Sequence, residues 1–157
     1  MFSEDNEVGY YHQPDDSIPA FLNKRPGKDA GYDVYASEST WVKPLGTVDI
    51  PVNLHIHTPE GYCALVCSRS GNASRGWLTH IGVGDHGYSG QYTATLTNLY
   101  LLPRRIKKGE RVAQIVFVPF KALKNLINVP HVSEFNTIVE ELSNSDRGHK
   151  SHNSSGK

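Results

Sequence analysis

The sequence predicts an all-β fold in which short strands form a sandwich or a distorted barrel. Between about residues 20 and 120, β-branched and aromatic residues are dense and are cut into short runs by Gly and Pro. Two of these runs, Val48–Ile56 and Gln91–Thr97, alternate apolar and polar residues with the period of a half-buried strand. No run in this region repeats apolar residues with a sustained helical period. Together these three observations favour the all-β class.

Other elements follow from the same kind of pattern. Tyr62–Cys67 has the composition of a strand. Val112–Phe120 is apolar on both faces, which predicts a strand that is covered on both sides. Only Phe120–Ile127 suggests a helix, and a short one.

The two cysteines, Cys63 and Cys67, lie four residues apart in the predicted strand Tyr62–Cys67. Four residues of extended chain span about 13 Å, whereas the two Cα atoms of a disulfide lie within about 7 Å. We therefore expect two free thiols that pack as small hydrophobic side chains, as in a reducing compartment.

Charge and hydropathy exclude several classes of function. Lys plus Arg total 16 and Asp plus Glu total 16, so the net charge is zero. The protein therefore has no net positive charge that would attract nucleic acid non-specifically. An anionic ligand must instead be bound by a few specifically positioned side-chain or backbone groups. No apolar run reaches the length of a signal peptide core or a membrane span. We expect a soluble intracellular protein without nucleic-acid or membrane partners.

The two ends of the chain differ in composition from its middle. Met1–Pro19 is polar and acidic and is expected to be a loosely held N-terminal extension. Ser143–Lys157 contains no aliphatic residue, so it cannot bury apolar surface and is expected to be disordered when the protein is alone. The prediction is one β domain over residues 1–142, with the extension included, and a flexible arm over residues 143–157.

Two segments place chemical groups near the ends of strands. In Asp29–Val34, a carboxylate beside small residues at a strand start could hold a hard cation through water, and an exposed turn Asp is the alternative. Ser68–Ala73 follows a strand and can aim backbone N–H groups and a hydroxyl at a phosphate. Arg69 adds a planar, positively charged guanidinium group. The alternative is that the segment is an ordinary polar loop.

In two further segments, a polar side chain lies in a glycine-rich turn or in a buried strand. Gly82–Gly90 contains four glycines in nine residues, which predicts a hairpin whose backbone approaches a ligand closely. Asp85 lies near the tip of this hairpin. The alternative to a chemical role for Asp85 is that it is an ordinary turn residue. In Lys108–Gln114, Gln114 interrupts a buried strand and is either a core hydrogen-bonding residue or a ligand contact.

Histidines are a weaker candidate for a site. His55 and His57 share the polar face of one predicted strand. Two histidines without Cys or acidic partners make a poor zinc site, so a solvated face is the favoured interpretation.

In their order along the chain, these segments resemble the five motifs of the dUTP pyrophosphatase (dUTPase) family. The resemblance spans about residues 24–156, and its strength lies in the order of motifs that are individually weak. The matching segments are Ala30–Val34, Arg69–Ala73, Gly82–Gln91, Gly109–Gln114 and Arg147–Gly156.

The resemblance implies a homotrimer of distorted jelly-roll (β-clip) domains, with each site built from three chains. The implied reaction is the hydrolysis of dUTP to dUMP and pyrophosphate, in which Mg²⁺ assists the attack of water on the α-phosphorus. The implied location is the cytoplasm, or the cytoplasm of a host if the protein is encoded by a virus.

The resemblance also implies a role for each candidate residue. Asp85 would be the catalytic base that deprotonates the water, and Asp33 would hold the water shell of Mg²⁺. The hairpin backbone from Gly82 onward would select uracil, with Tyr88 against the deoxyribose. The phosphates would be held by Arg69, Ser70, Gly71 and Gln114. The arm would close over the nucleotide through Arg147, His152, Ser154 and Ser155.

The sequence departs from the family pattern at several positions. Gly84 stands where a branched aliphatic residue is usual, and Gly87 stands where a second acidic residue is common. Thr79 replaces an Asn that often binds uracil, and His152 stands where Phe usually stacks on the base. An unusual hairpin conformation is therefore expected.

Two other functions are compatible with such a fold. A dCTP deaminase would need an acid/base Glu where Thr95 stands, and Thr cannot shuttle the protons of a deamination at neutral pH. The second alternative is a nucleotide-dependent binding protein that captures a regulatory partner, as some phage members of the family do. The residues before Lys24 are available for such a role, but they identify no partner.

Overall fold

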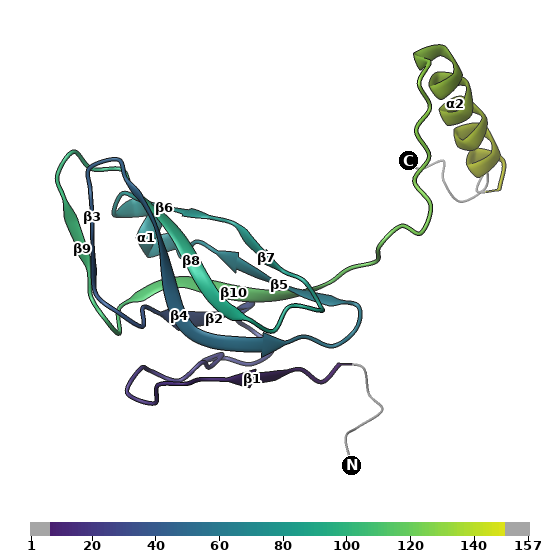
Figure 1. Cartoon of the computed structure of the whole chain (residues 1–157). Helices are drawn as coiled ribbons and strands as arrows, with labels where there is room; N and C mark the ends of the chain where they lie inside the picture. The colour runs from purple at the N-terminus through teal and green to yellow at the C-terminus, as the bar shows by residue number, and fades with distance from the viewer. Residues whose placement is uncertain (1–6, 150–157) are drawn as a thin grey trace. The chain divides into compact units, whose positions relative to one another are not determined.

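The computed structural model describes the backbone of residues 7–149 and the side chains of residues 7–145. The chain divides into two compact units, residues 1–121 and residues 122–157, and Figure 1 shows the strands in the first unit and α2 in the second. The strands are β1 Tyr10–His12, β2 Gly31–Tyr35, β3 Thr40–Val42, β4 Thr47–His57, β5 Tyr62–Cys67, β6 Trp77–His80, β7 Gly82–Gly84, β8 Gln91–Asn98, β9 Arg104–Ile106 and β10 Arg111–Pro119. The helices are α1 Ser70–Ser74 and α2 Val132–His149.

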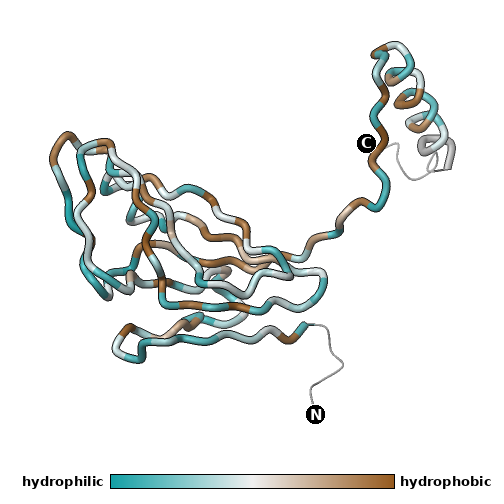
Figure 2. Tube along the Cα trace, in the orientation of Figure 1, coloured by the Kyte–Doolittle hydropathy of each residue, from teal (hydrophilic) through white to brown (hydrophobic). Residues whose placement is uncertain are grey.

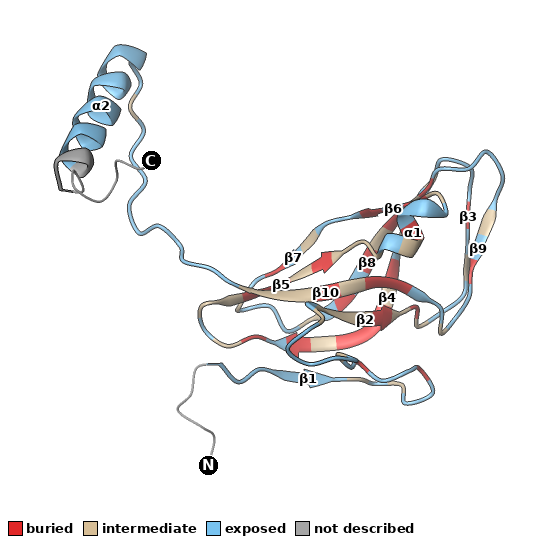
Figure 3. Cartoon of the chain, turned by 180° about the vertical axis from the view of Figure 1, so that it is seen from behind, coloured by how far each residue is buried: buried red, intermediate tan, exposed pale blue. Residues whose placement is uncertain are grey.

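Two four-stranded antiparallel sheets enclose the core of the first unit. Their strand orders are β1-β4-β8-β6 and β2-β10-β5-β7, while β3 and β9 form a separate pair. One apolar cluster draws side chains from both sheets, and Figure 3 shows buried residues along their strands. Members of this cluster include Val34, Ile50, Val66, Leu96 and Ile115. The predicted all-β class is confirmed.

The pairing of β4 with β8 follows the alternating pattern of their sequences. Ile50 lies opposite Ala94, and both are buried. Hydrophobic and hydrophilic residues alternate along the trace (Figure 2). The register shifts between Pro51 and His55, and Asn53 within this bulge has φ 59°, in the left-handed region that Asn tolerates.

The N-terminal extension is held by the domain, so the prediction of a loose arm is wrong for its described part. β1 pairs with the edge of β4. Asn53 accepts a hydrogen bond from the Asp15 N–H at 2.9 Å and donates one to the Asp15 carbonyl at 2.8 Å. Ile18 is buried, and Lys108 lies 3.2 Å from the Asp15 carboxylate. Composition alone misses this anchoring because the partners are distant in the sequence.

β10 lies between β2 and β5, as expected for an apolar strand. Val112, Ala113 and Ile115 are buried, but Val116–Val118 are only half-buried, so the expected cover on both sides is incomplete. Both cysteines lie in β5 and are free, as predicted. Burial raises the pKa of the Cys67 thiol.

The helix of the second unit lies further along the chain than expected. Phe120–Ile127 is not helical, and at its start the Phe120 N–H donates to the Gly61 carbonyl at 2.8 Å, which continues the pairing of β10 by one residue. α2 begins at Val132 and runs to His149, so residues 143–149 of the expected disordered arm are helical. Their polar composition gives no signal for this helix. In the described part of the chain, no helix is long and apolar enough to cross a membrane.

Candidate active site

The expected site segments gather in two places at opposite ends of β5. At one end, Ser68 follows the strand directly. At the other end, Gly84 of β7 lies opposite Ala64, so Asp85 falls level with Cys63. Five residue steps of about 3.3 Å along the strand separate these levels, or roughly 17 Å. We call the first group, Lys24, Asp33, Arg69, Arg111 and Gln114, the arginine cluster, and residues 82–90 the hairpin.

Three cationic side chains surround one carboxylate in the arginine cluster. Arg69 Nε donates to Asp33 Oδ1 at 3.0 Å, and Arg111 Nη1 donates to Asp33 Oδ2 at 3.3 Å. Lys24 Nζ lies 4.0 Å from the same Oδ2. The Asp33 side chain is only 20% exposed and lies on β2, so it is not an exposed turn residue. The cluster has a local surplus of positive charge although the whole chain is neutral.

Helix α1 fixes the loop that follows β5. Asn72 is buried, and its Nδ2 donates to the Val112 carbonyl at 2.7 Å, which ties α1 to β10. Arg69 occupies the position before α1, and Ser70 is exposed at its start. This part of the second motif is therefore a fixed segment beside Asp33 and not a mobile polar loop.

Gln114 connects this loop to the neighbouring strands. Its Nε2 donates to the Ser68 carbonyl at 2.9 Å. Its carboxamide covers Gly31, where a Cβ atom would overlap Oε1 and lie 2.8 Å from Cδ. Gln114 also lines a hollow of about 290 Å³ together with Asp33 and Lys24. The side chain thus makes an internal hydrogen bond and also borders an open site.

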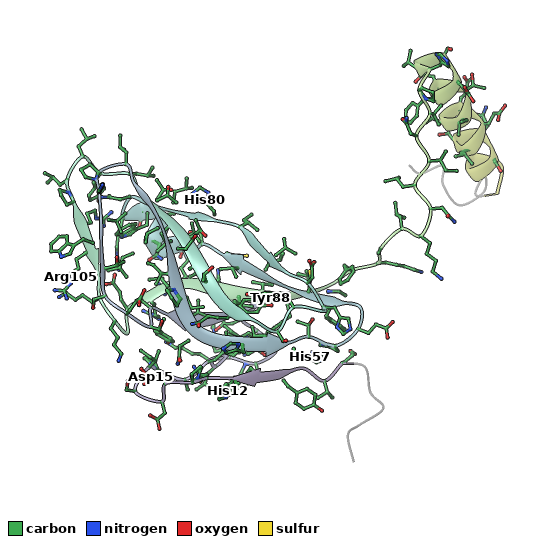
Figure 4. All side chains as sticks on the ribbon, in the orientation of Figure 1. His12, Asp15, His57, His80, Tyr88 and Arg105 are labelled. Atoms are coloured by element: carbon green, nitrogen blue, oxygen red, sulfur yellow. The ribbon has the colours of Figure 1, made fainter. Side chains whose placement is uncertain are left out.

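The hairpin is held by two histidine side chains that the predicted site does not include. His86 Nδ1 donates to the Thr58 carbonyl at 2.7 Å, and His55 Nδ1 donates to the Ser89 carbonyl at 3.1 Å. The favoured interpretation of His55 as a solvated residue therefore misses its bond to the hairpin. Figure 4 shows Tyr88 and His57 toward the same end of the sheets, with Arg105 at the opposite end.

Within the hairpin, a turn and a tyrosine set the local shape. The Tyr88 N–H donates to the Asp85 carbonyl at 3.0 Å, and the Tyr88 hydroxyl donates to the Gln91 carbonyl at 2.7 Å. A Cβ atom at Gly90 would lie 2.7 Å from the Tyr88 hydroxyl, so glycine is needed there. Asp85 is exposed at the start of this turn.

Comparison with known proteins identifies the family. The family model of dUTPase matches residues 17–156. The chain belongs to the dUTPase family. A deoxyuridine 5′-triphosphate nucleotidohydrolase of Leifsonia xyli is 35% identical over 143 residues, which are 88% of this chain and 85% of that protein. The corresponding enzyme of Candida glabrata is 33% identical over 129 residues, which are 82% of this chain and 83% of that protein.

Solved phage dUTPases share the fold. A point mutant of the Staphylococcus bacteriophage 80alpha dUTPase with dUpNHpp has a TM-score of 0.71 and 25% identity, over 79% of this chain and 89% of that one. A dUTPase mutant from phage phi11 of S. aureus has a TM-score of 0.70 and 22% identity, over 79% and 97%. The phi11 structure reveals the coordination of a structural Mg(II) ion. The jelly-roll expectation for this dUTPase is confirmed.

Tyr92 explains why this dUTPase has glycine before Asp85. The Tyr92 ring is buried beneath the hairpin, 5.5 Å from the Tyr88 ring between centroids. A Cβ atom at Gly84 would overlap the Tyr92 hydroxyl and lie 2.6 Å from Cζ and 2.8 Å from Cε2. Burial raises the pKa of Tyr92 to about 12, and the nearby Tyr88, Asp85 and Cys63 add to the rise. The phenol thus occupies space that a residue larger than Gly84 would need.

The residues of the arginine cluster fit a magnesium ion held through water. The described side chains include no group of three or more His, Cys, Asp or Glu that could hold a metal ion. Mg²⁺ commonly uses one or two carboxylates and completes its shell with water and substrate phosphates. A carboxylate has about four acceptor positions. Arg69 and Arg111 use one position on each Asp33 oxygen, so Asp33 can still accept hydrogen bonds from metal-bound water.

The predicted arm residues lie beyond the side chains that the structure describes. Arg147 lies in α2, whose side chains are described only to residue 145. His152, Ser154 and Ser155 lie outside the described residues. The predicted site also lacks Lys24 and Arg111, although Arg111 stands inside the fourth motif. His55 and Tyr92 lie outside the motifs. His86 lies inside the third motif, but its partner Thr58, like the partner Ser89 of His55, is distant in the sequence.

Proposed function

We propose that this dUTPase hydrolyses dUTP to dUMP and pyrophosphate in sites that join the hairpin of one subunit to the arginine cluster of another. The supporting observation is the separation of roughly 17 Å between the levels of Asp85 and Ser68 along β5. A base at Asp85 must reach water at the α-phosphorus, whereas phosphates held by Arg69 lie at the far end of the strand. A closed homotrimer supplies both halves at every site.

The arginine cluster binds the triphosphate in this proposal. Arg69 offers a planar fork that matches phosphate oxygens, and its guanidinium is already oriented by Asp33. The hydroxyl of Ser70 and the backbone at Gly71 supply further donors, and Gln114 borders the same region. Arg111 and Lys24 add positive charge, which stabilises the charge that develops on the phosphates in the transition state.

Magnesium binds beside Asp33 in this proposal. When bound, Mg²⁺ offsets charge on the phosphates. Asp33 would accept hydrogen bonds from water bound to the ion and would help to orient the triphosphate for in-line attack. The two arginine hydrogen bonds keep the carboxylate in one position for this task.

Asp85 is the general base of the proposed reaction. Its exposed carboxylate accepts a proton from the water that attacks the α-phosphorus, and pyrophosphate leaves from the opposite side. Tyr88 packs against the deoxyribose, with its ring held by the bond between its hydroxyl and Gln91. A ring so fixed leaves no room for a 2′-hydroxyl. The backbone from Gly82 pairs with the base.

The C-terminal arm closes the site in this proposal. Arg147 contacts the terminal phosphate, and His152 covers the uracil. Ser154 and Ser155 offer hydroxyls to the phosphates. The match to the family model extends to residue 156, which supports a functional arm. Closure excludes bulk water and strengthens the electrostatic interactions inside.

The proposed location is the cytoplasm, or a host cytoplasm for a viral protein. A regulatory partner is a second possibility raised by the phage dUTPases. Those of phage 80alpha control transfer of virulence genes by a G protein-like mechanism. Here the extension is paired with β4 and bonded to Asn53, so its described part offers no support for partner capture.

Mixing two inactive variants tests the shared site. Asp85→Asn chains keep the arginine cluster, and Arg69→Ala chains keep the hairpin. In co-expressed trimers that assemble at random, about a quarter of the sites combine an intact hairpin from an Arg69→Ala chain with an intact arginine cluster from an Asp85→Asn chain. We expect about a quarter of the wild-type turnover, although each variant alone is nearly inactive. If every site lies within a single chain, no intact site can form, and the absence of recovery would refute the proposal.

A further inference from the structure

In the described part of the chain, the buried Tyr92 hydroxyl has no hydrogen-bond partner. Tyr92 is 3% exposed. Among the described residues, its hydroxyl is one of three buried side-chain oxygens with no hydrogen-bond partner, the others being those of Thr58 and Thr79. Most buried polar groups in proteins are paired, so each exception needs a physical explanation.

The hydroxyl belongs to a residue that borders a hollow beside the hairpin. Tyr92 lines a hollow of about 130 Å³ together with Gly82, Gly84 and Tyr88. This volume is well above the ~10–15 Å³ that a single water needs, so the hollow can receive part of a larger ligand. The neighbouring Tyr88 hydroxyl is already bonded to the Gln91 carbonyl, so Tyr92 is the hydroxyl here that lacks a partner.

The absence of a side chain at Gly84 brings the hydroxyl to this position. Any Cβ atom at Gly84 would overlap it. With a branched aliphatic residue, as is usual in the family, the phenol could not lie there. Gly84 and Tyr92 together therefore place a hydrogen-bonding group where the family usually has an apolar side chain.

The chemistry of the hydroxyl selects a ligand atom that accepts a hydrogen bond. Because burial raises the pKa of Tyr92 to about 12, with Tyr88 and Asp85 nearby adding to the rise, the phenol keeps its proton at neutral pH. A phenol O–H is a good donor to a carbonyl oxygen. A pyrimidine base with ring carbonyls supplies such acceptors.

We propose that the Tyr92 hydroxyl donates a hydrogen bond to a carbonyl oxygen of the pyrimidine base of the bound nucleotide. Tyr92 is then a substrate-binding residue particular to this chain, paired with Gly84. The inference rests on the proposed function, because that function makes the hairpin the base-binding element.

The test is Tyr92→Phe, which removes the hydroxyl and keeps the ring. Isothermal titration would measure binding of dUpNHpp, dUMP and inorganic pyrophosphate to the full-length protein. We expect dUpNHpp and dUMP to bind roughly three- to tenfold more weakly, the usual effect of one hydrogen bond. Pyrophosphate, which has no base, should bind as before. The melting temperature should not fall, because the lost group has no partner among the described residues of the free protein.

Tyr100→Phe, a change at an exposed residue that stacks on Arg104, is the matched control and should leave all three affinities unchanged.

The possible outcomes separate this inference from the proposed function. If the wild-type protein hydrolyses dUTP and Tyr92→Phe binds dUMP as tightly as wild type, the inference is overturned and the function stands. Equal weakening of dUMP and pyrophosphate, or a lower melting temperature with unchanged binding, would show a structural hydroxyl and overturn it too. Failure of the wild-type protein to hydrolyse dUTP would instead refute the proposed function.

Discussion

Substitution of Gly84 by Ala tests the packing beneath the hairpin. The added Cβ atom would overlap the Tyr92 hydroxyl and come within 2.6 Å of Cζ, far inside van der Waals contact. The ring cannot move freely because it is buried between the sheets. Either the ring or the hairpin that carries Asp85 must shift.

The size of the effect follows from the cost of overpacking. Extra methyl groups in a well-packed core destabilise by about 1–3 kcal/mol. For a chain of 157 residues, each kcal/mol lowers the melting temperature by about 2–4 °C, so a drop of about 2–12 °C is expected. Gly87→Ala is the matched control in the same hairpin, because a Cβ atom there meets nothing within 4 Å. Its melting temperature should stay close to that of the wild type.

A double-mutant cycle assigns the cost to the Tyr92 ring. Tyr92→Leu alone should destabilise by leaving a void, but in the Gly84→Ala background it should relieve the overlap. Urea unfolding followed by circular dichroism would measure the four free energies of unfolding. We expect a coupling of about 1 kcal/mol or more, within the range for residues in contact. Additive effects, or equal stability of Gly84→Ala and Gly87→Ala, would refute this account of the hairpin.

Three further predictions follow. Asp85→Asn should lower turnover by roughly 10²-fold or more, because it removes the base, while titration shows that dUpNHpp still binds; near-normal turnover would exclude Asp85 as the base. Hydrogen bonds from Ser17, with Lys108 nearby, lower the pKa of Asp15 to about 2. Because this pKa is depressed, the stabilisation is present above about pH 4 and is lost as pH falls toward 2. Thermal melts should therefore decline more steeply over this range for the wild type than for Asp15→Asn, and equal slopes would contradict the assignment. Truncation before Arg147 should leave a folded trimer by light scattering and lower the catalytic rate more than substrate binding; full activity would show that the arm has no role in the site.

Strand positions are readable from the sequence because burial imposes a period. β4 and β8 each bury one face against the opposite sheet, so apolar residues recur at every second position. The second unit lacks such a constraint in its described part. Most of the side chains of α2 are exposed, so no buried stripe marks its bounds, and the helix was expected too early in the chain.

Motif order predicts which segments carry the site but not the contacts that hold them. His55 is 34 residues from Ser89, and Asn53 is 38 residues from Asp15. Neither pair has a local pattern that would reveal it. Tyr92 reads as an ordinary core position in an alternating strand, and its relation to Gly84 appears only when the two strands are placed together.

The central claim is tested most directly by pyrophosphate release from dUTP, dTTP, dCTP, dATP and dGTP, each with Mg²⁺ and with a chelator. The account predicts efficient turnover of dUTP alone, and its suppression by chelation. Comparable turnover of dTTP or dCTP would contradict the substrate assignment, and ammonia release from dCTP would indicate a deaminase instead.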